Sequence, residues 1–75
     1  MNNARRLQIS KAKMLLKSSI DILNVVSNEE QDSFDNLSEG LQQTRRGEQM
    51  EYNVDCIQEA VDKIQESIDS LDEVM

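Results

Sequence analysis

Apolar residues recur at alternating spacings of four and three along the C-terminal part of the chain. They are Met50, Val54, Ile57, Val61, Ile64, Ile68, Leu71 and Met75. A heptad repeat of this kind places apolar side chains on one side of an α-helix, whereas a strand would require alternation at period two. The pattern predicts a helix over about residues 45–74 that packs against another helix.

The N-terminal part of the chain, over about residues 4–35, is also predicted to be helical, but it carries two apolar stripes. At 100° per residue, the first stripe contains Ile9, Leu16, Ile20, Leu23 and Phe34. The second stripe contains Leu7, Met14, Leu15, Ile22, Val25 and Val26. Together they span roughly 240°, whereas a one-sided surface helix needs about 100° or somewhat more. A single partner helix cannot cover both stripes, so this helix is expected to contact a second subunit; the alternative is a loose hairpin with an exposed apolar patch.

The predicted fold class is all-α: an antiparallel helical hairpin that forms one domain over residues 1–75 and dimerises into a four-helix bundle. Charge favours the antiparallel arrangement. Residues 1–24 carry five bases and one acid, whereas residues 48–75 carry nine acids and one base. Folding the two arms back on each other therefore places the basic start of the first helix beside the acidic end of the second.

The connection over residues 36–44 is predicted to be a structured loop that contains a short helical turn. Asn36 can end the first helix in a left-handed conformation, and Thr44 is the best candidate to cap the second helix. Leu37 and Leu41 are expected to cover the open end of the bundle. Longer ordered connections of this kind often carry function.

The central motif Asp-Asn-Leu-Ser-Glu-Gly-Leu-Gln, followed by Thr-Arg-Arg-Gly-Glu-Gln-Met-Glu, spans residues 35–51. It resembles the central motif of a group of short bacterial and bacteriophage-type helical proteins of no settled function. The resemblance extends over roughly residues 29–72, with Ser38 in place of the proline of that group. It implies a helical hairpin and a phage origin, and it names no reaction.

Composition limits the chemistry of the chain. Its 75 residues include fifteen acids, eight bases, no histidine and one cysteine, for a formal net charge of −7. So short a chain usually gains stability from disulfides, a metal or a partner. One cysteine cannot pair within the chain, and without histidine the usual zinc sites and catalytic triads are missing. We therefore expect a binding protein rather than an enzyme, with no cofactor and no bound metal, although a carboxylate-rich Mg²⁺ site stays open.

The first candidate site is an arginine-bearing loop at the start of the second helix. It consists of Thr44, Arg45, Arg46 and Gly47. Unpaired backbone N–H groups at a helix start and two guanidinium groups can bind a phosphate, nucleotide or carboxylate. The alternative is that both arginines pair with neighbouring acids and stabilise the loop.

The second candidate is a row of carboxylates beside the heptad positions of the second helix. Its central members are Asp55, Glu59, Asp62, Glu66 and Asp69, with Glu48, Glu51 and Glu73 at its ends. Such a row can occupy the basic groove of a nucleic-acid-binding protein. The alternative is a solvated helix face that is partly paired with the first helix.

The third candidate is an interface between subunits. It combines the second apolar stripe with small residues of the second helix, and its predicted members are Leu15, Ile22, Val25, Val26, Cys56 and Ala60. Small side chains permit a close approach of helices. The alternative for Cys56 and Ala60 is a half-buried border of the packing within one chain.

The predicted function is that of a small non-catalytic protein, a phage-type regulator or inhibitor that acts by protein–protein contact as an oligomer. Two alternatives are a protein that sequesters nucleotide or phosphate ligands through the arginine-bearing loop, and a purely structural assembly factor. Residues 7–26 are interrupted by polar side chains, so neither a signal peptide nor a membrane span is expected. The lone cysteine and the acidic surface favour a cytoplasmic protein, in the host cell if it is phage-encoded, that binds neither nucleic acid nor membrane directly.

Overall fold

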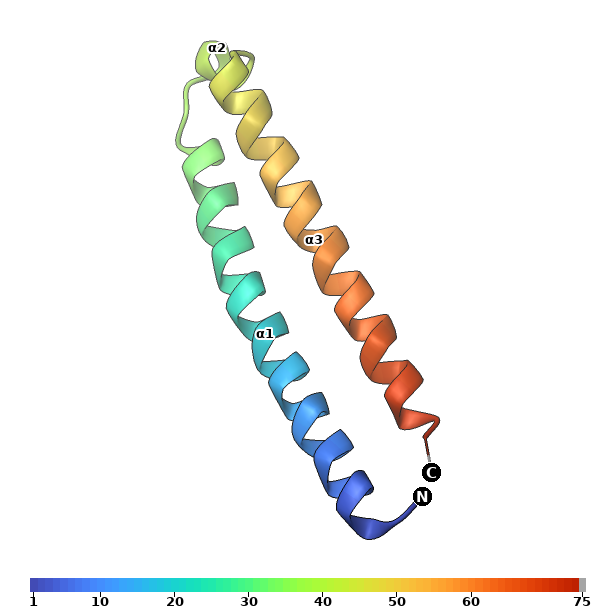
Figure 1. Cartoon of the computed structure of the whole chain (residues 1–75). Helices are drawn as coiled ribbons and strands as arrows, with labels where there is room; N and C mark the ends of the chain where they lie inside the picture. The colour runs from blue at the N-terminus through green and yellow to red at the C-terminus, as the bar shows by residue number, and fades with distance from the viewer. Residues whose placement is uncertain (75) are drawn as a thin grey trace.

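The computed structural model describes residues 1–74 and consists of two long antiparallel helices joined by a short one (Figure 1). Helix α1 spans Asn3–Asp35, α2 spans Glu39–Gln42 and α3 spans Arg45–Asp72. The chain turns at α2, so both termini lie at the opposite end of the hairpin (Figure 1). The all-α hairpin and its short helical turn are confirmed, whereas the assembly of two hairpins into a four-helix bundle stays a prediction. None of the described helices is long and apolar enough to cross a membrane.

The hydrophobic core is a single seam between α1 and α3, as the heptad pattern of the second arm and the first apolar stripe of the first arm predict. From α3 it contains Met50, Val54, Ile57, Val61, Ile64, Ile68 and Leu71, all buried or half-buried. Met75, the last position predicted for this pattern, lies outside the described residues. The first stripe of α1 faces them and contains Ile9, Leu16, Ile20, Leu23 and Phe34, all half-buried. Among the described residues, only Val54 and Ile68 are buried apolar residues, since a two-helix layer leaves most seam positions partly open to solvent.

Two polar pairs mark the register of the hairpin. At the open end, Lys13 Nζ forms an ion pair with Asp72 Oδ1. Nearer the turn, Asn53 Nδ2 donates to Glu30 Oε2 at 2.7 Å. The Lys13 ammonium group, through its hydrogen bond, holds the pKa of the Asp72 carboxyl below its usual value of 3.8. The basic start of α1 therefore lies beside the acidic end of α3, as predicted.

Side-chain caps hold the helix ends. The Asn2 side chain accepts from Arg5 N at 2.8 Å at the start of α1, and Ser38 Oγ accepts from Leu41 N at 3.3 Å at the start of α2. The prediction of a left-handed Asn36 is wrong, because this residue keeps a right-handed backbone with φ −80°. Its N–H can then still donate to the carbonyl of Asp32 at 3.0 Å.

Gln42 joins the end of α1 to the turn. Its Nε2 donates to the carbonyls of Phe34 at 3.2 Å and of Leu37 at 3.3 Å. Leu37 is half-buried, as expected for a residue that covers the end of the bundle. The same prediction is wrong for Leu41, which is 53 % exposed because the α2 turn directs it away from the seam.

Gly47 is the position where α3 passes directly beneath this turn. It is buried, and a Cβ built on it would overlap the backbone carbonyl oxygen of Gln42. Gly40 is a contrasting case, because a Cβ there would meet no atom within 4 Å. Glycine is needed at position 47 because the backbones of α3 and the turn approach each other closely there.

Candidate functional site

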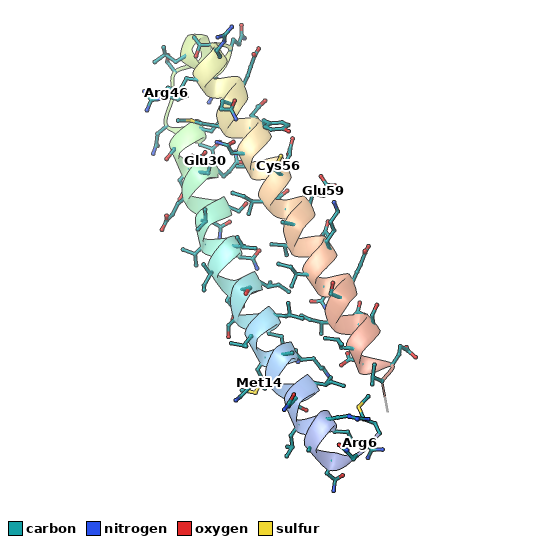
Figure 2. All side chains as sticks on the ribbon, viewed as in Figure 1. Arg6, Met14, Glu30, Arg46, Cys56 and Glu59 are labelled. Atoms are coloured by element: carbon teal, nitrogen blue, oxygen red, sulfur yellow. The ribbon has the colours of Figure 1, made fainter. Side chains whose placement is uncertain are left out.

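The largest exposed apolar feature is one side of α1, here called the apolar flank. It consists of Leu7, Met14, Leu15, Ile22, Val25 and Val26. Their exposed fractions run from 42 % for Val26 to 71 % for Leu7. Met14 points away from α3 (Figure 2). The second stripe of the sequence pattern is therefore left uncovered by the chain's own α3, as expected.

The two sides of the hairpin seam differ in chemistry. On the side of the apolar flank, the residues that border the seam are uncharged and mostly small: Ala12, Ser19, Val26 and Ser33 of α1, with Asn53, Ala60 and Ser67 of α3. On the opposite side they are polar or charged: Ser10, Lys17, Asn24 and Gln31 of α1, with Glu51, Gln58, Gln65 and Asp72 of α3. The border residues of the first side are uncharged, so a helix that packs on them buries less charge than one on the second side.

An open groove of about 440 Å³ continues the apolar flank towards α3. Its lining residues are Val26, Glu29, Glu30, Ser33, Asn53, Cys56 and Ile57. Of the predicted interface residues of α3, Cys56 is exposed in this groove and Ala60 is half-buried. The structure thus places Cys56 beside Val26, on the same face as the rest of the predicted interface.

The Glu30–Asn53 pair in the floor of this groove was not predicted from the sequence. Glu30 and Asn53 are both half-buried, and Gln49 Nε2 donates to Asn53 Oδ1 at 2.9 Å. Asn53 therefore uses its amide nitrogen for Glu30 and its oxygen for Gln49. One sequence feature could have indicated this polar pair. Ser27 and Glu30 occupy positions of α1 where the spacing of the first apolar stripe calls for apolar residues.

Tyr52 lies one helical turn before Cys56 on α3 and is 63 % exposed. A hydrogen bond with the Cys56 thiol raises the pKa of the Tyr52 phenol above 10.0, and partial burial and Glu59 act in the same direction. Because its pKa is raised, the Tyr52 phenol stays neutral near pH 7 and adds no charge beside the groove.

The acidic row lies on exposed positions of α3. Asp55, Glu59, Asp62, Glu66 and Asp69 are all exposed. Glu59 points away from α1 and pairs with Lys63 at 3.1 Å (Figure 2). Gln65 Nε2 donates to Asp69 Oδ1 at 3.1 Å. Across residues 1–74, no three acidic or thiol side chains gather closely enough to hold a metal ion.

Two of the four residues of the arginine-bearing loop take part in the turn itself. Thr44 is the N-cap residue of α3, as predicted, but its side chain makes no capping hydrogen bond. Its hydroxyl donates instead to the carbonyl of Leu41 and closes the α2 turn. Gly47 is packed under Gln42, whereas Arg45 and Arg46 are exposed and form no ion pair with any described residue. The loop therefore presents two free guanidinium groups on a closed turn.

Comparison with protein-family models, with curated proteins and with solved structures finds no match to this chain.

Proposed function

We propose that this chain is a small non-catalytic binding protein that self-associates through the apolar flank of α1 and acts on another protein. The observation that carries the proposal is the exposure of six large apolar side chains on one side of one helix. Complete burial of such a side chain contributes roughly 1.5–3 kcal/mol. Because these side chains are 42–71 % exposed, covering each of them would contribute about 1–2 kcal/mol.

The total surface of the chain supports the same proposal. The hairpin exposes 5838 Å² and is 58 Å long, with a radius of gyration of 17.2 Å. A compact protein of 8.6 kDa would expose about 4,700 Å² and have a radius of gyration of about 11 Å. The excess of roughly 1,100 Å² is somewhat more than the ~800 Å² that each partner buries in a typical interface. One subunit contact would return the exposed area to the normal range.

The acidic row of α3 is the surface that we propose for a different protein. Its five central members are exposed and Glu59 points away from α1 (Figure 2), so the row stays accessible when the apolar flank is covered. A partner with a basic groove matches its charge. Recognition of this kind depends strongly on salt because exposed charges are screened.

Two differently tagged copies expressed together test the self-association. We expect them to purify together, and we expect Leu15→Lys to abolish the co-purification because it places a charge in the middle of the apolar flank. Recovery of one tag alone from the wild-type pair would contradict the proposed self-association.

Capture from bacterial lysate tests the acidic row. Asp62→Lys/Glu66→Lys leaves the Glu59–Lys63 pair intact, and it should remove any protein that the wild type retains. Asp35→Lys/Glu39→Lys carries the same charge change at the turn and should retain that protein. Equal capture by both variants would rule out the acidic row as the binding surface.

A further inference from the structure

We propose that the apolar flank is covered by α1 of a second copy of this chain, in antiparallel orientation, with the two-fold axis near Ser18. The inference rests on the proposed self-association and adds to it the occupant, the direction and the paired residues. It follows from the order of charged and apolar positions along the exposed side of α1.

The charges of α1 are divided between its two halves. Residues 1–17 carry five bases and no acid, which are Arg5, Arg6, Lys11, Lys13 and Lys17. Residues 18–35 carry five acids and no base, which are Asp21, Glu29, Glu30, Asp32 and Asp35. A parallel contact between two copies of α1 would align like charges, whereas an antiparallel contact aligns opposite ones.

The apolar residues of the flank are arranged around the same centre. Leu15 and Ile22 lie three and four residues to either side of Ser18, so an antiparallel copy places Leu15 against Ile22 of the second copy. The exposed Ser18 and the half-buried Ser19 occupy the centre, where small side chains let the two helices approach. In this register Lys11 lies opposite Val26 of the second copy.

The same register brings opposite charges together at both ends of the flank. Arg5 lies opposite Asp32 of the second copy, and Lys11 lies within one helical turn of Glu29 of the second copy. All four side chains are exposed, and none of them forms an ion pair with a described residue of its own chain. An isologous contact forms each of these pairs twice.

Helix α3 of a second copy is a poorer candidate for the occupant than α1. Residues 48–75 carry nine acids and one base, so this helix presents almost only negative charge along its length. The apolar flank has a basic end at Lys11 and an acidic end at Glu29. A partner with one sign of charge would therefore be complementary to only one of these ends. A second α1 matches both ends.

Sedimentation equilibrium of charge-exchange variants tests this arrangement. Lys11→Glu and Glu29→Lys should each raise the dimer dissociation constant about tenfold, because each creates two repulsive pairs. Lys11→Glu/Glu29→Lys exchanges the charges within one chain and should restore the wild-type constant to within about threefold. A parallel dimer would keep the wild-type dissociation constant in both single variants and in the double variant.

Matched lysine substitutions on opposite sides of α1 complete the test. Ile22→Lys should raise the dissociation constant at least ~100-fold, whereas Asn24→Lys, on the polar side, should change it less than about threefold. Circular dichroism should show unchanged helicity for both. A wild-type dimer that is indifferent to the charge exchange overturns the antiparallel arrangement and leaves self-association standing. A wild-type monomer at tens of micromolar overturns the inference and the proposed self-association together, and leaves the capture test of the acidic row unaffected.

Discussion

Gly47→Ala is the substitution whose effect follows most directly from the packing of the turn. An alanine Cβ at this position would overlap the Gln42 carbonyl oxygen, and it would lie 2.6 Å from the carbonyl carbon and 2.7 Å from Cα of the same residue. All three are backbone atoms, so no side-chain rotation relieves the overlap. The α2 turn must move away from α3, which also weakens the two hydrogen bonds that the Gln42 side chain makes.

Two opposing effects decide the magnitude. Alanine in a helix is favoured over glycine by up to about 1 kcal/mol. Overpacking at a rigid contact costs about 1–3 kcal/mol, and weakened hydrogen bonds add to that cost. We expect a net loss of about 1–2 kcal/mol in the free energy of unfolding, which lowers the Tm by roughly 4–16 °C in a domain of this size.

Gly40→Ala is the matched control, because the same methyl group there meets nothing within 4 Å. It lies in α2 and should stabilise the chain by up to about 1 kcal/mol. The two variants should therefore shift the Tm and the urea midpoint in opposite directions at equal chain concentration. Stabilisation by Gly47→Ala, or equal effects of both variants, would refute the close approach described for the turn.

Three further predictions concern side-chain contacts. Asn53→Ala should lower the urea midpoint by the equivalent of about 1 kcal/mol, because it leaves the half-buried Glu30 carboxylate without its donor. Glu30→Leu/Asn53→Leu should recover this loss, and an unchanged midpoint in Asn53→Ala would contradict the pairing. Gln42→Ala should cost about 1 kcal/mol in thermal unfolding, because the carbonyls of Phe34 and Leu37 each lose the hydrogen bond from the Gln42 amide, and a gain in Tm would contradict this role. The depressed pKa of Asp72 contributes stability that is present above about pH 3.8 and is lost as the pH falls below it. In urea titrations, the free energy of unfolding of Lys13→Ala should therefore fall less with acid than that of the wild type, and parallel profiles would exclude the pair.

The elements of the fold could be predicted because they follow from local periodicity. The apolar periodicity of each arm requires only that apolar residues share a side of a helix, and the structure contains α1 and α3 within two residues of the predicted bounds. The exposure of Leu15 and Ile22 could also be predicted, since an apolar sweep of roughly 240° exceeds what one helix can cover.

The details of the turn could not be predicted because they depend on choices between neighbouring partners. Thr44 has the right residue type for a cap, but its hydroxyl donates a hydrogen bond to the nearby Leu41 carbonyl instead. Asn36 tolerates a left-handed backbone, yet the continuation into α2 uses the right-handed one. Gly47 looked like part of an anion pocket, and only the folded turn places Gln42 against it.

The Glu30–Asn53 pair could not be predicted for another reason: its two residues are 23 positions apart, and their contact depends on the register between α1 and α3. The heptad pattern identifies Glu30 as a polar residue at a core position, but it does not say which α3 residue lies opposite. The same knowledge of register, applied to a second copy of α1, is what turns an exposed stripe into a defined subunit contact.

The measurement that tests the central claim most directly is the mass of the wild-type protein by sedimentation equilibrium at tens of micromolar chain. Self-association through the apolar flank predicts a species of twice the 8.6 kDa chain mass, and it predicts the chain mass alone for Ile22→Lys under the same conditions. A wild-type protein that sediments as a single 8.6 kDa chain at that concentration would contradict the claim.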